Sequence, residues 1–415
     1  MGKTSMDKKN VKNKDVKDKN VKNNLNNEKR DFLTVRDLTA EELEHILKRA
    51  AVFKRECDSL RQCVVGVRPP ASTGMRPPAS TGMRPPASTG VRPPASMGMR
   101  ASALTGMQAS ASVRPLAGMS VGLIFFKAST RTRISFEVGV HQLGAQPIYI
   151  KPEDSQMGRG ESIADTARVF SRYLHGVVIR TFEHSLIEEF ARHASIPVIN
   201  GLTDTHHPCQ ALADAMTIFE RKGAFKGVKV VYVGDGNNVA NSLIEISARL
   251  GMDLTVACPK GYEPDEGILK AAKKEHKGIR IMNDPVKAAK GADVLYTDVW
   301  VSMGDNKVNA ARKKQALKKF QINDKLLEAA APDAIVLHCL PAHRGREITD
   351  EVMDGPQSAV FDQAENRLHT QKAVMEMIMA PHDIIGAGGR TPIGEADASI
   401  SEEAAASKDR IRGDF

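Results

Sequence analysis

The stretch Val121-Gly-Leu-Ile-Phe-Phe126, followed at once by Lys127-Ala-Ser-Thr-Arg-Thr-Arg133, decides the fold class of this chain. The first part is an apolar run of the length of a buried strand, and the second is a polar turn that leads into a helix ending near Leu143. The same order recurs at 228–233, where a glycine-rich turn and a helix to Leu250 follow. Buried strands that alternate with helices are typical of parallel sheets covered by helices, so we predict an α/β fold.

Three further apolar runs extend this pattern towards the C-terminus, at residues 254–257, 294–297 and 334–338. With 415 residues the chain has room for two domains, and we expect two parallel β-sheets, each flanked by helices. In open α/β sheets, ligands bind where the strands end. The functional residues are therefore expected at the carboxyl ends of these strands.

The positive charge of the chain lies outside this predicted body. The formal net charge is +9, but residues 1–30 carry ten Lys or Arg against four acidic residues, and residues 66–118 carry six Arg and no acidic residue. The rest of the chain is slightly acidic, which argues against a nucleic-acid-binding core. Residues 1–30 are rich in Lys and Asn and have too few apolar side chains to bury a core, so we predict a disordered tail there, and a second polar tail at 391–415.

An octapeptide repeat occupies residues 66–118, where Arg-Pro-Pro-Ala-Ser-Thr-Gly-Met recurs with Arg68, Arg76, Arg84 and Arg92 in register. Eight residues are too few for a helical repeat and paired prolines disfavour helix, so we expect a flexible loop, partly of polyproline II. Two interpretations stay open. The segment is either a docking site for a partner or an insertion that is tolerated because lengthening a surface loop adds little closure entropy.

The five cysteines are scattered and form no Cys-x-x-Cys pair, so neither a disulfide framework nor a structural zinc site is expected. No apolar run reaches the roughly 18–20 residues that span a bilayer. The N-terminus has no apolar core of the signal-peptide kind. These features predict a soluble, cytoplasmic protein with no membrane partner.

The turn Ser129–Thr132 lies at the N-terminus of the first expected helix. Its hydroxyl groups, the guanidinium of Arg131, the free backbone N–H groups and the positive end of the helix dipole meet there, which favours binding of a phosphate dianion. An alternative fits these residues equally well. It is an ordinary hydroxyl cap, with Arg133 paired to Glu137 one turn later.

Three further motifs carry groups suited to a small polar substrate. His207 and Gln210 in His-Pro-Cys-Gln are spaced so that a ring donor and an amide meet one small planar group. Cys339, after the last predicted strand, offers a thiol that would orient an amine nucleophile, although most free cysteines are simply buried small apolar residues. Asp298 and Ser302 offer a carboxylate and a hydroxyl suited to an ammonium group.

A fifth motif, Gly234-Asp-Gly-Asn-Asn238, looks like a dinucleotide-binding turn but lacks two of its features. Val239 holds the place of the third glycine, and the next strand ends in Ala257-Cys258-Pro259, with no acidic residue for a ribose hydroxyl. A nucleotide cofactor is therefore not expected. Asn237 and Asn238 would instead offer amide donors near a strand end.

Taken in order, Ser-Thr-Arg-Thr-Arg, His-Pro-Cys-Gln, Ser-Met-Gly and His-Cys-Leu-Pro resemble the motifs of the carbamoyltransferase family, and within it those of its ornithine-specific members. The resemblance covers residues 31–56 and 119–380, and Ala128 stands where proline is usual in the family. It implies a carbamoyl phosphate-binding domain at 31–222, an ornithine-binding domain at 223–360, and a C-terminal helix at 361–390 that returns to the first domain.

The resemblance also implies roles for the matching residues of this chain. Those implied to bind carbamoyl phosphate are Ser129, Thr130, Arg131, Thr132, Gln156, Arg180, His207, Gln210, Cys339, Leu340 and Arg367. Those implied to bind ornithine are Asn238, Asp298, Ser302 and Met303. Arg131, His207 and Cys339 are the implied catalytic residues, and no metal or organic cofactor is required. Family members form homotrimers with shared active sites, and Gln156 would reach the phosphate site of a neighbour.

The expected reaction transfers the carbamoyl group of carbamoyl phosphate to the side-chain amine of L-ornithine. Aspartate as the acceptor would need cations for its second carboxylate, whereas Asp298 supplies an acidic group. Putrescine stays open as an acceptor because diamines also bind to carboxylates. A catalytically silent relative with the repeat as its binding surface is the alternative from another class, and the intact Arg131, His207, Asp298 and Cys339 speak against it.

Overall fold

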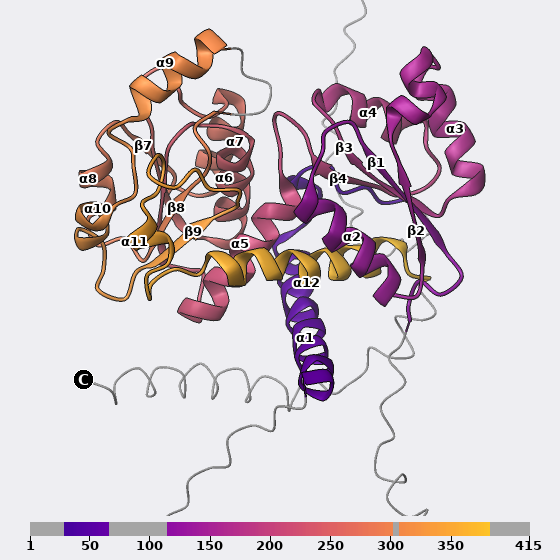
Figure 1. Ribbon diagram of the computed structural model, residues 1–415, viewed down its shortest axis with the longest axis horizontal. Helices are drawn as coiled ribbons and strands as arrows, with labels where there is room; N and C mark the ends of the chain where they lie inside the picture. Colours follow the sequence, from indigo (N-terminus) through magenta and orange to yellow (C-terminus); the bar gives the residue numbers. More distant parts are fainter. Residues whose placement is uncertain (1–28, 66–113, 302–306, 382–415) are drawn as a thin grey trace, which may run out of the picture.

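The computed structural model describes residues 29–65, 114–301 and 307–381, which form two α/β lobes side by side (Figure 1). The fold class predicted from the strand and helix pattern is confirmed. Residues 1–28 of the first predicted tail, the whole of the second and most of the repeat predicted as a flexible loop lie outside the described residues, as do Ser302 and Met303. The last five residues of the predicted insert, 114–118, are described, and Leu116 among them is buried in the core.

The first lobe contains a four-stranded parallel sheet of β1 (Ser120–Phe125), β2 (Gln146–Ile150), β3 (Gly176–Arg180) and β4 (Val198–Leu202), in the order β2-β1-β3-β4. The central strands are apolar on both faces because helices cover both, and Val121, Leu123 and Ile124 are fully buried. The covering helices are α2 (Thr130–Gln142), α3 (Ile163–Tyr173), α4 (His184–His193) and α5 (Pro208–Lys222), with short 3₁₀ turns η1 (Val35–Asp37), η2 (Pro152–Asp154) and η3 (Gln156–Arg159).

The second lobe contains a five-stranded parallel sheet of β5 (Lys229–Val233), β6 (Asp253–Ala257), β7 (Arg280–Met282), β8 (Val294–Thr297) and β9 (Ile335–His338), in the order β7-β6-β5-β8-β9. Its helices are α6 (Asn238–Leu250), α7 (Glu266–Glu275), α8 (Pro285–Ala289), α9 (Lys307–Leu317), α10 (Asp324–Glu328) and α11 (Asp350–Met353).

Both sheets change strand order at one point, between β1 and β3 in the first and between β5 and β8 in the second. At such a point the connections on either side run to opposite faces of the sheet, and a crevice forms at the carboxyl ends of the two strands. The turn Ser129–Thr132 follows β1, and Arg180 ends β3. Asn238 follows β5, and Asp298 follows β8. The topology therefore places the predicted ligand-binding residues at the crevices of the two sheets.

The C-terminal helix α12 (Val360–Met379) runs beneath both lobes and packs against α2, α5 and the long helix α1 (Ala40–Val65) of the first lobe (Figure 1). The predicted return of this helix to the first domain is confirmed. At Gly139 on α2, a Cβ atom would lie 3.2 Å from Met375 Cε and 3.3 Å from Lys372 Cγ, so glycine allows the two helices to approach closely. No helix in the described part of the chain is long and apolar enough to cross a membrane.

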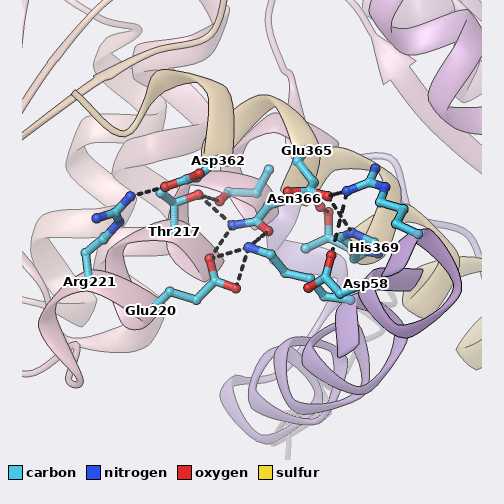
Figure 2. Close-up of polar contacts among 12 residues, drawn as sticks. Asp58, Thr217, Glu220, Arg221, Asp362, Glu365, Asn366 and His369 are labelled. Carbon is cyan, nitrogen blue, oxygen red and sulfur yellow. Dashed lines mark hydrogen bonds and ion pairs between the residues drawn. The ribbon is translucent and has the colours of Figure 1, made fainter. Parts of the chain in front are cut away.

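Polar contacts among α1, α5 and α12 fix the start of the returning helix (Figure 2). Lys54 Nζ donates to Glu220 Oε1 and to Asn366 Oδ1, each at 2.9 Å, and Asn366 Nδ2 donates to Thr217 Oγ1 at 2.9 Å. Arg61 pairs with Glu365 across the α1–α12 contact. These bonds hold the turn of α12 that also carries Arg367.

Candidate active site

A cluster of cationic side chains lies at the crevice of the first sheet. Arg131 comes from the first turn of α2, Arg180 from the end of β3, and Arg367 from α12. Burial, the charge of Arg367 and then that of Arg131 lower the pKa of Arg180 to about 10. Like charges held together in this way are typical of an anion-binding site.

His207 lies among these arginines, directly before α5. Burial and the charges of Arg367, Arg180 and Arg131 lower the pKa of this imidazole well below its ordinary value. The ring is therefore uncharged at neutral pH and has a single N–H to donate. Its Nδ1 is buried and makes no hydrogen bond to any other described residue, so the ring keeps a polar atom for a ligand or water.

Arg367 is oriented by residues of the first lobe. Its Nη1 donates to Gln210 Oε1 at 2.9 Å, and its Nη2 donates to Thr132 Oγ1 at 3.4 Å. The Gln210 amide nitrogen in turn donates to Asp214 Oδ1 at 2.8 Å, and Gln363 donates to the same oxygen at 2.7 Å. Three predicted carbamoyl phosphate residues, Thr132, Gln210 and Arg367, are thus connected directly.

The turn after β1 contains the hydroxyl cap that the structural alternative predicts. Ser129 caps α2, with its hydroxyl accepting from the backbone N–H of Thr132 at 3.3 Å. Arg133 Nε donates to Glu137 at 2.9 Å and turns to the Tyr149 ring, as the structural alternative predicts. Thr130 and Arg131, in contrast, stay exposed at the helix N-terminus. The residues that form the helix cap, Ser129 and Thr132, and the exposed Thr130 and Arg131 are therefore different residues of one turn.

An acidic group lies at the crevice of the second sheet. Asp298 is buried and accepts from the Cys339 thiol at 2.8 Å, from the Asn237 amide at 2.7 Å and from the backbone N–H of Val299 at 2.7 Å. Burial, followed by the charge of Asp298, raises the pKa of Cys339 well above its ordinary value, so the thiol stays protonated. Asp298 therefore already has three donors around it.

The two crevices face each other. Asp298 of the second lobe lies close enough to Arg131 of the first that its charge opposes the lowering of the Arg131 pKa by burial, and the Cys339 thiol lies 2.8 Å from Asp298. A ligand that contacts the cationic cluster therefore lies close to the thiol and carboxylate opposite.

The strand end at Cys339 could also supply metal ligands, because ligand atoms of Asp298, His338 and Cys339 lie within 4.8 Å of one another. Each of these atoms already has a protein partner. His338 Nδ1 accepts from the N–H of Leu340 at 2.9 Å, and its Nε2 lies 3.3 Å from Glu347 Oε1. Leu340 itself has a left-handed backbone with φ of 59°, rare for a residue other than glycine, which shapes the loop beside the thiol.

Some predicted residues lie apart from these two groups. Asn238 donates its amide N–H to the Thr203 carbonyl at 2.6 Å, so this donor is used within the protein. Gln156 is exposed on η3, and among the described residues it makes no hydrogen bond to the cationic cluster. Ser302 and Met303 lie outside the described residues.

Two family models match consecutive parts of the chain. The carbamoyl-phosphate binding domain of aspartate/ornithine carbamoyltransferase matches residues 96–220, and the Asp/Orn binding domain matches residues 226–378. Ornithine carbamoyltransferase of Methanocorpusculum labreanum is 46% identical over 351 residues, covering 85% of this chain and 98% of that protein. The chain belongs to the aspartate/ornithine carbamoyltransferase family.

Two further proteins of the family are also similar to this chain. Ornithine carbamoyltransferase of Syntrophus aciditrophicus is 58% identical over 266 residues, which are 64% of this chain and 88% of that protein. The solved structure of ornithine carbamoyltransferase from Pyrococcus furiosus superposes with a TM-score of 0.69 at 44% identity, over 85% of this chain and 97% of that chain.

Two residues of the candidate site were not predicted from the sequence as site residues. The Asp214 carboxylate accepts hydrogen bonds from Gln210 and Gln363. The Asn237 amide nitrogen donates to Asp298, and its oxygen caps α6. Asp214 carried a usable signal, because it lies four residues after Gln210 and therefore on the same face of α5. Asn237 was noted only as an amide donor, because nothing local indicates that the partner is a carboxylate 61 residues away.

Proposed function

We propose that this chain transfers the carbamoyl group of carbamoyl phosphate to the δ-amine of L-ornithine and forms L-citrulline and phosphate. The observation that carries the proposal is that three arginines and His207, gathered at the crevice of the first sheet, lie opposite Asp298 and Cys339 at the crevice of the second. Ornithine carbamoyltransferases that match nearly their whole length to this chain support it.

In this proposal the first lobe binds carbamoyl phosphate. Ser129, Thr130, Arg131 and Thr132 hold the phosphate at the N-terminus of α2, where helix dipole and side-chain donors act together. Arg180 and Arg367 add charge from β3 and α12. His207 donates to the carbamoyl oxygen, and Gln210 binds the carbamoyl nitrogen. Gln156 reaches the phosphate site of a neighbouring subunit.

The second lobe binds ornithine. Asp298 receives the α-ammonium group, and the oxygen of the Asn238 amide accepts from the same group, since the Asn238 nitrogen is already bonded to Thr203. Ser302 and the backbone of Met303 lie beside them at the α-carboxylate. Cys339 and Leu340 line the path of the reacting amine.

The chemistry needs a neutral amine and a stabilised oxyanion. By analogy with lysine, the δ-ammonium group has a pKa near ~10.4 in water, and desolvation beside cations lowers it so that a proton is released. The amine nitrogen then bonds to the carbonyl carbon, and negative charge gathers on the former carbonyl oxygen. Arg131, Thr132 and His207 stabilise that charge. The carbon–oxygen bond to phosphate breaks, the departing phosphate takes up the extra proton of the nitrogen, and hydrogen phosphate leaves.

The test offers the purified protein carbamoyl phosphate with ornithine, putrescine or aspartate in separate reactions and measures the ureido product. We expect product when ornithine is the acceptor and none when putrescine or aspartate is offered instead. Product with putrescine at a comparable kcat/KM would reassign the acceptor to diamines, and no product with any amine would contradict the proposal. Asp298→Asn is the matched control, because it keeps the shape of the site and removes the charge for the ammonium group.

We also propose a cytoplasmic homotrimer with shared sites. Large apolar side chains stay exposed on the first lobe, among them Ile134 on α2 at 53%, Val169 on α3 at 40% and Tyr173 on α3 at 72%. Such surface is typical of subunit contacts. Light scattering should give three times the 45.1-kDa chain mass. A monomer with full activity would contradict the shared role of Gln156.

A further inference from the structure

Helix α6 presents a row of polar side chains to the first lobe. Asn238, Asn241, Ser242 and Glu245 occupy positions i, i+3, i+4 and i+7 and therefore lie on one face of the helix. Asn241, Ser242 and Glu245 are buried, with exposures of 5%, 0% and 1%. Burying polar groups is costly unless they are bonded, so this row calls for partners on the facing surface.

The partners lie in the loop 203–207, which ends at His207. Asn238 Nδ2 donates to the Thr203 carbonyl at 2.6 Å, and Asn241 Nδ2 donates to the Thr205 carbonyl at 3.1 Å. The backbone N–H of His207 donates to Ser242 Oγ at 2.8 Å. A helix of the second lobe thus holds the main chain of a first-lobe loop at three successive points.

The fourth residue of the row faces the side chain beside His207. Glu245 Oε2 lies 3.5 Å from His206 Nδ1, and neither atom makes a hydrogen bond, to the other or to any further described residue. The His206 ring packs on the His184 ring of α4 with centroids 4.7 Å apart, and Glu188 of α4 lies 3.9 Å from His184. The facing titratable groups are therefore Glu245 from α6 and His184 and Glu188 from α4.

We infer that Ser242 and Glu245 are positioning residues that fix the imidazole of His207 from the opposite lobe. Ser242 holds its backbone N–H, and Glu245 holds the neighbouring His206 against α4. This inference rests on the proposed role of His207 at the carbamoyl oxygen. Because α6 also begins with Asn238 in the proposed ornithine site, one helix connects the acceptor side to the donor side.

The test compares two buried serines of the same helix. Ser242→Ala removes the acceptor for His207, whereas Ser247→Ala removes a fully buried hydroxyl that has no partner among the described residues. Misplacing a catalytic group by a fraction of an ångström is costly, so Ser242→Ala should lower kcat by about tenfold to a hundredfold. Ser247→Ala should keep the wild-type kcat, and both should keep the KM for ornithine. Glu245→Gln should lower kcat by a factor similar to that of Ser242→Ala.

A double-mutant cycle separates positioning from a general loss of structure. In a His207→Ala background, Ser242→Ala and Glu245→Gln should have no further effect on kcat, because the group that they position is gone. Additive losses, or equal losses for Ser242→Ala and Ser247→Ala, would overturn the inference and leave the proposed function standing. Wild-type turnover by His207→Ala would refute both. If Glu245→Gln does not fold, the serine comparison decides alone.

Discussion

The two halves of the site differ in how their charges are balanced. On the first lobe, Arg131, Arg180 and Arg367 surround an uncharged His207, and mutual repulsion contributes to the lowered pKa of Arg180. On the second lobe, the Asp298 carboxylate accepts bonds from a thiol, an amide and a backbone N–H. The guanidinium groups of the cationic half repel one another, whereas the carboxylate of the acidic half already has its hydrogen-bond donors within the protein.

This difference bears on where binding energy arises in each half. An anion that enters the cationic half relieves the repulsion among its guanidinium groups and gains charge-assisted hydrogen bonds. An ammonium group that approaches Asp298 competes with the Cys339 thiol for the same carboxylate oxygen. The binding of carbamoyl phosphate should therefore be driven by charge. The binding of ornithine should depend on replacing the Cys339–Asp298 hydrogen bond by a bond from the ammonium group.

The largest effect is expected from the cationic half. Arg131→Ala should lower kcat by at least about a hundredfold, because charge that develops on the carbamoyl oxygen and phosphate loses its nearest exposed cation. Steady-state kinetics with both substrates measures it. Arg133→Ala is the matched control, since its guanidinium is two residues away but pairs with Glu137. Comparable losses in the two variants would show that the charge of Arg131 has no special role.

Removing the negative charge of Asp298 should weaken the binding of ornithine and leave that of carbamoyl phosphate unchanged. Asp298→Asn should raise the KM for ornithine by at least about tenfold, because an ammonium group loses its counter-charge. The KM for carbamoyl phosphate should change little. Asp284→Asn, at the partly exposed N-cap of α8, controls for general effects of the substitution. An equal rise in both KM values would contradict the division of the site into two halves.

The thiol of the acidic half should react slowly. Because burial and Asp298 raise the pKa of Cys339, little thiolate is present at pH 8, and iodoacetamide should modify it more slowly than the partly exposed Cys57 of α1. In Asp298→Asn the rate at Cys339 should rise several-fold relative to Cys57. Peptide mass spectrometry over time measures both rates. Rapid modification of Cys339 in the wild-type protein would refute the proposed environment.

The smallest effect on turnover is expected at Asp214, behind Gln210. Burial raises the pKa of Asp214 from 3.8 to about 7, so the folded protein binds more protons than the unfolded chain between these values. The free energy of unfolding should therefore fall as the pH rises from about 4 to about 7.

Asp214→Asn removes this contribution while its oxygen can still accept from Gln210. Relative to wild type its stability should increase with pH over that window, by at most about 4 kcal/mol, with kcat within about threefold. Urea denaturation at pH 5 and pH 8 measures the difference. A constant difference between the two proteins would show that Asp214 ionises normally in the fold.

The strand–turn–helix units could be predicted because their signal is local. The apolar run 121–126 and the hydroxyl cap at Ser129 specify β1 and the start of α2 without reference to distant residues. The convergence of Arg131, Arg180, His207 and Arg367 was implied by family motifs, and the electrostatic contacts among them are consistent with it.

The rest depends on contacts between elements that are far apart in the chain. The glycine-rich turn before α6 was predicted to be a poor nucleotide site, and the sequence of its helix gave no sign of the polar row that bonds to loop 203–207. Glu245 and His206 are separated by 39 positions in the sequence and by the whole of β5, so no spacing rule connects them. Likewise, the amide nitrogen of Asn238 is used by Thr203, which only the packed structure reveals.

The most direct test of the opposed charges is a calorimetric titration of carbamoyl phosphate into wild-type protein, Arg180→Gln and Asp298→Asn. One binding site per chain is expected in the wild type and in Asp298→Asn, with similar affinity, and binding should weaken by at least about tenfold in Arg180→Gln, because the charge-assisted bonds of one guanidinium are lost. Undiminished binding to Arg180→Gln, or loss of binding in Asp298→Asn, would contradict a donor site built on the cationic half.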